Sequence, residues 1–191
     1  EALHGFTIAQ ITDIHVGPTI KRGFVEPIVD TVNALRADMI AVTGDLVDGS
    51  VARLSAHMQP LSRLSARHGT FFVTGNHEYY SGSGAWIHFL RRLGINVLVN
   101  ERVAIGDVTR RGAQFDLAGI SDRMGARWNR GPDVLAATCD RDTQRELVML
   151  AHQPVQIADS VRVGAGLQLS GHTHGGQLLP FGAVARLHQP Y

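Results

Sequence analysis

The sequence predicts an α/β fold, in which buried strands alternate along the chain with helices that cover them. Three observations support this prediction. Short apolar runs recur along the chain, as buried strands do. The stretches between them place apolar residues at helical spacing, and this alternation favours an α/β domain. With 191 residues and 44% hydrophobic content, the chain is also large enough for one domain with a sizeable core.

The first half of the chain contains three expected strands separated by two expected helices. The strands are expected at residues 6–11, 39–42 and 70–73. The first helix covers residues 23–37, where apolar side chains from Phe24 to Leu35 recur at helical spacing. The second covers residues 53–67, in which Pro60 forces either a break or a first-turn position.

The second half begins with a short expected helix at residues 85–93, which Gly94 ends. Four further strands are expected at residues 96–105, 114–120, 146–151 and 167–170. Residues 106–112 read as a hairpin turn between the first two of these strands, and residues 154–163 read as a helix between the last two. The longest irregular stretch is 125–132, where we expect a surface loop. A more specific alternative is a loop on the side of the domain that binds substrate.

Charge and cysteine content exclude some classes of function. The net charge is +1, from 18 Lys and Arg against 17 Asp and Glu, so no basic field suggests nucleic acid and we expect no nucleic-acid partner. Cys139 is the single cysteine, so no internal disulfide can form and the redox compartment stays open. No apolar run approaches the roughly 20 residues that a bilayer span requires, and no signal peptide opens the chain.

Seven potential metal ligands fall in five short clusters, nearly all at points where an expected strand ends. They are Asp13, His15, Asp45, Asn76, His152, His172 and His174. In an open α/β sheet, ligands gather at the carboxyl ends of strands. Oxygen and imidazole ligands without thiolates suit a pair of hard-to-borderline divalent metals. Two such metals, about 3.5–4 Å apart, can clamp the attacking and leaving oxygens of a phosphoryl group.

Each cluster taken alone has an ordinary structural explanation. A lone Gly-Asp or Gly-Asn is usually a turn, although Gly44 and Gly75 also permit close backbone approach before the polar residue. A single strand-end histidine such as His152 is more often a hydrogen-bonded core or rim residue. The pair His172 and His174 is a stronger signal, because two imidazoles flanked by glycines make a poor core and a good metal loop. The joint order of the clusters is more specific than any one of them.

The ordered motifs resemble the calcineurin-like metallophosphoesterase superfamily. They run Asp-x-His, Gly-Asp-x-x-Asp, Gly-Asn-His-Glu, strand-end His and Gly-His-Thr-His, and the resemblance extends from Ile11 to about Pro180. The run Gly-His-Thr-His-Gly-Gly-Gln is similar to the membrane-associated branch, whose bacterial members include lipid-related phosphodiesterases. The resemblance implies a four-layer αββα sandwich of two mixed β-sheets flanked by helices, with a dimetal site at the carboxyl ends of the strands.

The resemblance also implies a role for each candidate ligand. The first metal would be held by Asp13, His15 and His174, the second by Asn76, His152 and His172, and the Asp45 carboxylate would bridge the two. Mn, Fe or Zn suits this set, and the sequence does not choose among them. His77 is the expected proton donor, and Asp48 would orient and charge it. The alternative for Asp48 is an ordinary helix N-cap. The remaining histidines, His4, His57, His68, His88 and His188, match no motif position and are expected to be structural or surface residues.

The function that follows from the resemblance is a dinuclear-metal-dependent phosphoester hydrolase, in which metal-bound hydroxide attacks phosphorus directly. We expect a phosphodiesterase that acts on a lipid-related or other small organic phosphodiester. Alternatives are a phosphomonoesterase, a cyclic-nucleotide phosphodiesterase and a non-catalytic metal-binding scaffold, although a scaffold should have lost ligands. A nuclease would need a basic track along its substrate, and a protein phosphatase would need a shaped groove.

Apolar residues beside the ligands suggest a lipid substrate. They include Leu178, Leu179 and Phe181 after the histidine pair, and Tyr79, Tyr80, Trp86 and Phe89 after Asn76. For Trp86 and Phe89, ordinary packing in the core is at least as good an explanation as contact with a lipid. The resemblance implies that the catalytic domain is soluble and its parent protein membrane-associated, and no protein partner is expected. We expect residues 1–191 to be a single catalytic domain cut from a longer protein.

Overall fold

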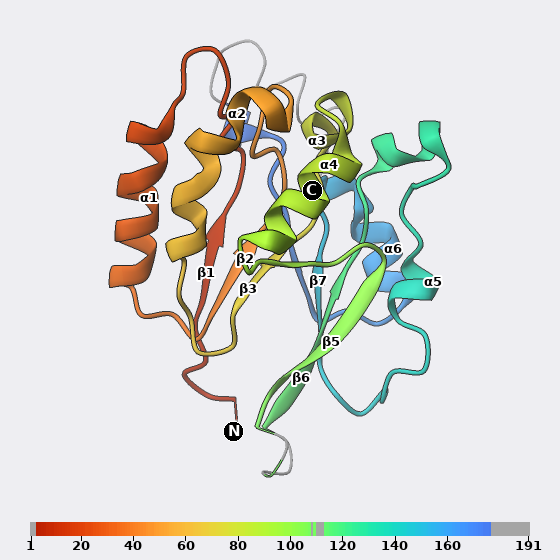
Figure 1. Cartoon of the computed structure of the whole chain (residues 1–191). Coiled ribbons are helices and arrows are strands. Elements are labelled where there is room, and N and C mark those ends of the chain that lie inside the picture. Colours follow the sequence, from red (N-terminus) through yellow and green to blue (C-terminus); the bar gives the residue numbers. More distant parts are fainter. Residues whose placement is uncertain (1–2, 108, 110–112, 177–191) are drawn as a thin grey trace.

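The computed structural model describes residues 3–107, 109 and 113–176, and within them two four-stranded sheets pack face to face (Figure 1). The first sheet has the order β1-β2-β3-β4, and every neighbouring pair in it is parallel. Its strands are β1 (Ile8–Ile11), β2 (Met39–Val42), β3 (Thr70–Phe72) and β4 (Asn96–Val97). Parallel strands need crossover connections, and helices supply them here. The first sheet is therefore wholly parallel in its described strands, and the prediction that both sheets are mixed is wrong for it.

The second sheet is mixed, as predicted. Its strands are β5 (Glu101–Gly106), β6 (Gln114–Gly119), β7 (Leu147–Leu150) and β8 (Leu167–Leu169), in that spatial order. The pair β5 and β6 is antiparallel, whereas β6, β7 and β8 run parallel to one another. The antiparallel pair confirms the predicted hairpin, although part of its turn, residues 108 and 110–112, lies outside the described residues.

One predicted strand is two strands in the structure. The range 96–105 divides into β4, which ends at Val97 in the first sheet, and β5, which begins at Glu101 in the second. Asn100, with φ 56°, turns the chain between them, and its side-chain oxygen accepts hydrogen bonds from the backbone of Ser121 and Asp133. The apolar run continues through the turn because Leu98 is buried between the sheets, so hydrophobicity alone does not reveal the change of sheet.

The helices on the first sheet are α1 (Arg22–Ala34), α2 (Val51–Met58), α3 (Asn76–Tyr80) and α4 (Ser83–Arg92). The second sheet carries α5 (Val134–Ala137) and α6 (Ile157–Arg162). The expected helix 53–67 breaks as Pro60 predicts, because α2 gives way to a 3₁₀ helix over Gln59–Arg63. Part of the expected loop 125–132 is also regular, with a 3₁₀ helix over Arg123–Trp128.

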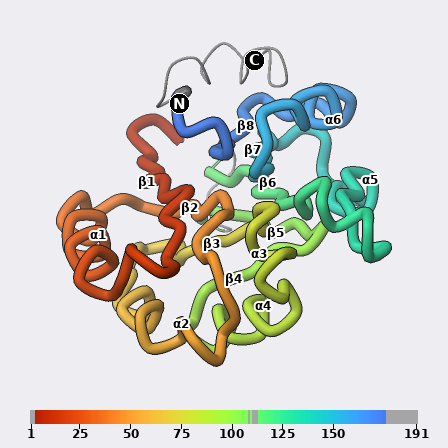
Figure 2. The backbone as a smooth tube through the Cα atoms, turned by 90° about the horizontal axis from the view of Figure 1, so that it is seen from above, coloured from red at the N-terminus to blue at the C-terminus, as the bar shows by residue number. Residues whose placement is uncertain are grey.

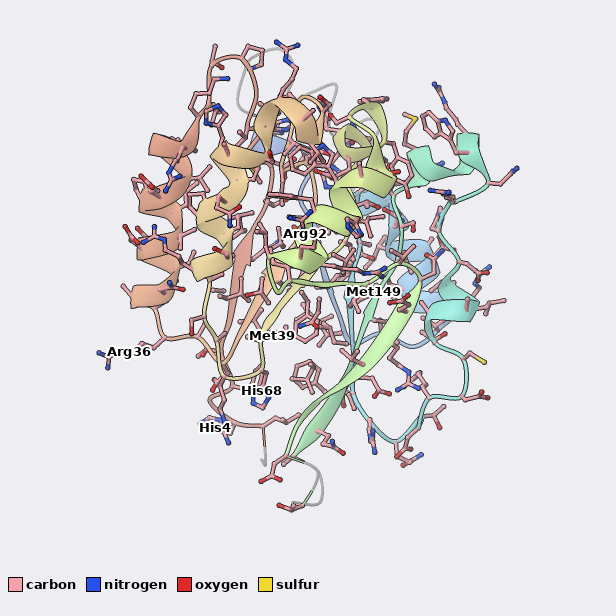
Figure 3. The ribbon with its side chains drawn as sticks, in the orientation of Figure 1. His4, Arg36, Met39, His68, Arg92 and Met149 are labelled. Atoms are coloured by element: carbon pink, nitrogen blue, oxygen red, sulfur yellow. The ribbon has the colours of Figure 1, made fainter. Side chains whose placement is uncertain are left out.

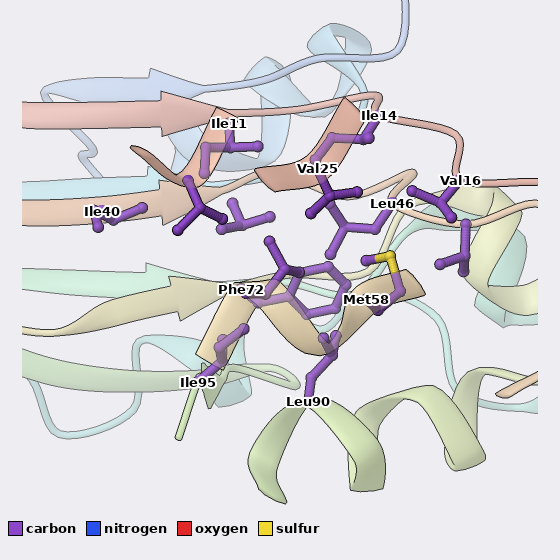
Figure 4. Packing of buried hydrophobic residues seen from close by; sticks show 14 of the residues in the cluster. Ile11, Ile14, Val16, Val25, Ile40, Leu46, Met58, Phe72, Leu90 and Ile95 are labelled. Carbon is purple, nitrogen blue, oxygen red and sulfur yellow. The ribbon is translucent and has the colours of Figure 1, made fainter. Parts of the chain in front are cut away.

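Three clusters of buried side chains correspond to the three interfaces between four layers. Along β2, Ile40 and Val42 face the cluster under α1, α2 and α4, whereas Met39 and Ala41 face the second sheet. Figure 4 shows the first cluster, and Figure 2 shows the helices on the outer side of each sheet. The third cluster includes Met149 on β7 and packs against α5. Each fully buried aliphatic side chain contributes roughly 1.5–3 kcal/mol of transfer free energy. Because alternate residues of β2 belong to different clusters, burial stabilises the packing on both faces of the first sheet.

Parallel β1, β2 and β3 end at one edge of the first sheet, at the top in Figure 1. The loops after β7 and β8 reach the same edge, where Gln10 on β1 donates a hydrogen bond to the carbonyl of Ser170. Within the described part of the chain, no helix is long and apolar enough to cross a bilayer.

Candidate metal centre

Five strand ends deliver the predicted ligands to one place. Asp13 and His15 follow β1, Asp45 follows β2, and Asn76 opens α3 directly after β3. The remaining three, which follow β7 and β8, are His152, His172 and His174. The two sheets thus contribute to the same cluster.

A first group of donor atoms gathers around Asp13. The Nε2 atoms of His15 and His174 lie 3.2 Å apart, and Asp13 Oδ1 lies 3.4 Å from His174 Nε2 and 3.9 Å from His15 Nε2. Ligand bonds to a divalent metal are about 2.0–2.2 Å long, so two donors on one ion lie roughly 3–4 Å apart. The three side chains therefore have the spacing of ligands that share an ion.

A second group gathers around His152. Its Nε2 atom lies 3.1 Å from Asp45 Oδ2 and 3.2 Å from His172 Nδ1. Asp45 Oδ2 is also 3.9 Å from His15 Nε2 in the first group. Asp45 therefore lies between the two groups, which is the position that a bridging carboxylate requires.

His152 is oriented by a contact on the far side of its ring. Its Nδ1 atom donates a hydrogen bond of 2.6 Å to the backbone carbonyl of Thr43, which leaves Nε2 to face Asp45. Burial disfavours the charged imidazole, yet the hydrogen bond and negative charge of Asp45 raise the pKa of His152 to about 9. A second contact that fixes the ring and the tautomer is typical of histidines that bind metals.

Asp48 joins two of the histidines. Its Oδ1 atom accepts hydrogen bonds from Nδ1 of His77, at 2.5 Å, and from Nδ1 of His15, at 3.0 Å. The alternative that Asp48 is a helix N-cap is wrong, because Ser50 holds that position on α2. Both rings are held through Nδ1, so both direct Nε2 toward Asp45, which lies 4.0 Å from His77 Nε2.

Most of the candidate ligands have unusual backbone conformations. Five of them have positive φ: Asp13 (53°), His15 (52°), Asp45 (52°), His172 (72°) and His174 (49°). A non-glycine residue in such a conformation costs about 1–3 kcal/mol and persists only where its surroundings enforce it. Here the amide of Asp13 donates to the carbonyl of Gly44 at 3.1 Å, and the amide of His15 donates to that of Asp45 at 3.1 Å. The loops after β1 and β2 thus hold each other in place.

Three glycines make room for the cluster. A β-carbon on Gly75 would collide with the Asp45 carboxylate, and one on Gly171 would collide with Thr12 and Asp13. Gly44, with φ 93°, packs against Gly75 and His152. The close approach inferred from the glycines that precede Asp45 and Asn76 is therefore confirmed.

Glu78 belongs to this site, and the sequence reasoning missed it. Its carboxylate is fully buried and accepts hydrogen bonds from three backbone amides, those of Asp45 (2.9 Å), Leu46 (2.8 Å) and Gly75 (2.7 Å). Burial, together with the charge of Asp45, raises the pKa of Glu78 to about 7, although the three amides oppose the shift. In the sequence it is the last residue of the motif Gly-Asn-His-Glu, to which no role was given, because a glutamate two residues after Asn76 reads as an exposed residue of a first helical turn.

The sequence profile of the calcineurin-like phosphoesterase family matches residues 6–176. The chain belongs to this family. The predicted resemblance is confirmed, and membership of a metallophosphoesterase family implies divalent metal ions.

Curated relatives of this calcineurin-like phosphoesterase carry the same family name. The chain is 39% identical over 186 residues to an uncharacterized metallophosphoesterase of Helicobacter pylori, across 96% of the chain and 48% of the relative. It is 37% identical over 197 residues to a transmembrane protein with metallophosphoesterase domain of Danio rerio, across 100% of the chain and 45% of the relative. The chain spans about half the length of the curated relatives it matches.

Solved structures confirm the fold. An NAD nucleotidase of Haemophilus influenzae matches with a TM-score of 0.56 at 15% identity, over 88% of this chain and 38% of that one. A 5'-nucleotidase precursor from Thermus thermophilus matches with a TM-score of 0.56 at 17% identity, over 88% of this chain and 42% of that one. At these identities the likeness extends to the α/β architecture of two sheets flanked by helices.

One orphaned atom in this calcineurin-like phosphoesterase tests whether its residues fit the implied metals. Asn76 is buried, and its Oδ1 atom has no hydrogen-bond partner among the described residues. A buried acceptor without a partner costs about 1–3 kcal/mol. The amide of the next residue, His77, donates to Asp45 Oδ1 at 2.8 Å. A divalent cation beside Asp45 would supply the missing partner, so the residues present fit the implied metals.

Except for the tyrosines, the remaining predicted residues lie apart from the cluster or outside the described range. His4 and His68 are at the opposite edge of the molecule (Figure 3), and His57 and His88 are on α2 and α4. Trp86 and Phe89 are buried in the core, as the alternative interpretation predicted, whereas Tyr80 is exposed beside His77. The positions that fall outside the described residues are Leu178, Leu179, Phe181 and His188.

Proposed function

We propose that the chain is the catalytic domain of a metal-dependent phosphodiesterase that acts on a small, lipid-related phosphodiester. The observation that carries the proposal is the position of Asp45 between two groups of histidine and carboxylate donors. A shared carboxylate offsets the repulsion between two neighbouring dications, which is what a dinuclear centre requires.

The roles proposed for the ligands follow the two groups. Asp13, His15 and His174 would hold the first ion, and His152, His172 and Asn76 the second, with Asp45 shared. Two divalent ions bound there would activate a water and neutralise the charge that develops on the phosphoryl oxygens. Mn, Fe or Zn suits this set of oxygen and nitrogen donors.

His77, oriented by Asp48, would donate a proton to the leaving group. Asp48 accepts a hydrogen bond from Nδ1 of His77 and fixes the ring, so Nε2 would be placed to give a proton to the departing alkoxide. The imidazole faces the Asp45 side of the cluster and is partly open to solvent. General acid–base groups contribute roughly 10²–10⁴-fold to turnover.

Two observations support a lipid-related diester. The Danio rerio relative is named as a transmembrane protein with a metallophosphoesterase domain, and it matches the whole of this chain at 37% identity. Tyr80 is exposed, with its ring 5.4 Å from that of His77, so an exposed aromatic ring borders the proposed acid. The near-neutral net charge favours a small substrate over a nucleic acid.

Metal analysis combined with two variants tests this proposal. We expect two divalent ions per chain in the purified protein, and fewer after Asp45→Asn, because that change weakens the shared ligand. We expect His77→Ala to keep both ions and to lose turnover on diesters presented in solution and in phospholipid vesicles. Loss of metal from His77→Ala would make His77 a ligand, and faster hydrolysis of monoesters than of diesters would replace the phosphodiesterase assignment.

A further inference from the structure

A hollow of about 450 Å³ opens beside the candidate metal centre, between the loop after β1 and the loop after β2. Asp48 lines it together with Lys21, Ser50 and Arg53, and Leu54 forms part of its wall. The oxygen of Asp48 that accepts from His15 and His77 connects this hollow to the site. Its volume lies within the range of about 300–1,000 Å³ that small-ligand sites occupy.

The charge around the hollow is positive. Lys21 and Arg53 form no ion pair with any residue that the structure describes. Arg22, which follows Lys21 in the chain and is outside the lining, is paired with Glu26 at 2.7 Å. The one acidic group in the lining, Asp48, is shared by two histidines, so neither of the two cations has a carboxylate of its own in the lining.

Two helices add to this field. Lys21 is the N-cap of α1 and Ser50 is the N-cap of α2, and Figure 1 shows both helices starting at the edge that carries the site. Neither helix has an acidic residue in its first turn or a side-chain hydrogen bond at its cap. Free amides at a helix start carry partial positive charge and favour anions. Their partial charge has the same sign as the charge of the two side-chain cations.

We propose that this hollow is a subsite for a second anionic group, a phosphate or a carboxylate, carried by the same phosphoester substrate. The inference rests on the proposed function, because the scissile phosphoryl group must lie at the metal centre next to Asp48. The substituent of that group extends over Asp48 and places its own anion between Lys21 and Arg53. Two isolated cations match one further anion, and they form no track for a polymer backbone.

A matched pair of soluble diesters tests the subsite. The first is the p-nitrophenyl phosphodiester of glycerol, and the second is the same ester with a phosphate on the terminal hydroxyl. We expect the wild-type protein to have the higher kcat/KM for the second ester. In the Lys21→Ala/Arg53→Ala double variant, the ratio of the two kcat/KM values should fall about tenfold or more, because the charge-assisted contacts to the second anion are lost. The change should lie mainly in KM, because the contact is equal in the ground and transition states.

Two controls separate the subsite from general effects. Arg22→Ala removes a neighbouring cation outside the lining and should leave the ratio unchanged. Lys21→Arg/Arg53→Lys keeps both charges and should restore most of the preference. An equal loss on both esters in the double variant, or an unchanged ratio, would overturn the subsite while leaving the hydrolase proposal intact.

A binding measurement tests the subsite even if the protein hydrolyses none of these esters. The non-hydrolysable methylene phosphonate analogue of the doubly anionic ester is titrated calorimetrically into metal-loaded protein. Binding that weakens about tenfold in the double variant, without turnover of any ester, supports the subsite and removes the proposed function. Binding that is the same in both proteins removes the subsite. Phosphatidylcholine vesicles that carry phosphatidylglycerophosphate distinguish the two sources of the second anion. Hydrolysis of the lipid in these vesicles assigns the anion to a lipid headgroup, whereas hydrolysis of the soluble ester alone assigns it to a free substrate.

Discussion

Glu78 is the residue on which the geometry of the site depends most directly. One buried carboxylate binds the amides of Asp45 and Leu46 in the loop after β2, and the amide of Gly75 in the loop after β3. These loops carry Asp45 and Asn76, so Glu78 fixes the distance between two proposed ligands without contributing an atom to the metal.

Replacement of Glu78 tests this role. Glu78→Ala leaves three buried amides without an acceptor, each at a cost of about 1–3 kcal/mol, so we expect a lower urea midpoint and fewer than two ions per chain. Glu78→Gln keeps the shape and one acceptor oxygen, and it should lie between the alanine variant and the wild type. Elemental analysis and urea unfolding measure the two effects. Full metal occupancy in Glu78→Ala would show that the loops hold their positions unaided.

Gly75 gives a second prediction at the same scale. A β-carbon there meets the carboxylate and the amide of Asp45, so Gly75→Ala should displace the shared ligand and lower metal content. Gly23→Ala is the matched control, since a β-carbon at Gly23 meets nothing within 4 Å. Anomalous scattering from crystals of both variants would show which ion position empties. Two fully occupied positions in Gly75→Ala would contradict the steric argument.

The sequence predicted which residues meet at the site, and it did not predict how their backbone is arranged. Asp45 and His152 could be found because strand ends concentrate polar side chains at one edge. The positive φ of His172 could not be found, because a side-chain-bearing residue gives no signal of a left-handed conformation that its tertiary contacts impose. Glu78 escaped notice for a related reason, since burial depends on the neighbouring loop and not on local pattern.

At the scale of elements, α4 supports the loop that carries Asp48. Trp86 on α4 is fully buried and donates a hydrogen bond of 2.9 Å from Nε1 to the carbonyl of Gly49, the residue after Asp48. Its ring also packs edge-to-face against Phe89, with centroids 5.5 Å apart. A helix that contributes none of the proposed ligands thereby supports the residue that orients His77.

We expect Trp86→Phe to affect turnover more than metal content. The change keeps most of the apolar volume and removes the hydrogen bond to Gly49, at a stability cost of about 1–3 kcal/mol for the unpaired carbonyl. The loop then holds Asp48 less firmly, so kcat should fall while two ions remain bound. Phe89→Leu changes the same core without touching the loop, and its kcat should stay near that of the wild type. An equal fall in kcat for both variants would point to general loosening of the core.

Element boundaries show where pattern reasoning reaches its limit. Strand β2 was predicted with its observed bounds because its four residues are all apolar and flanked by polar ones, and the structure buries all four. The division of residues 96–105 between two sheets was missed. Leu98 is apolar and buried, so it looks like part of one continuous strand, and only the turn at Asn100 separates β4 from β5. The local sequence indicates which residues are buried, whereas the sheet that a strand joins depends on tertiary contacts.

At the scale of the whole molecule, the proposed ligands come from both sheets. Asp13, Asp45 and Asn76 follow strands of the first sheet, and the three C-terminal histidines follow strands of the second. Bound metal would therefore cross-link the two sheets at their shared edge, in addition to the apolar cluster between them.

Removal of metal should consequently lower the thermal stability of the whole domain. An ion present at 100 times its Kd stabilises the folded state by about 2.7 kcal/mol, so we expect EDTA to lower the Tm of the wild-type protein measurably. Asp45→Asn already lacks the shared ligand, and its Tm should respond less to the chelator. Differential scanning calorimetry with and without EDTA makes the comparison. Equal shifts in both proteins would indicate that the chelator acts elsewhere.

The contact between His15 and His174 joins residues that are 159 positions apart. During translation, the first ligand leaves the ribosome long before its partner has been synthesised, and domains fold as their elements emerge. A nascent chain that stalls or terminates before His172 would carry the whole first sheet and no complete set of donors for either ion. Premature products would then be inert toward phosphoesters, so the order of synthesis itself delays activity until the second sheet has closed against the first.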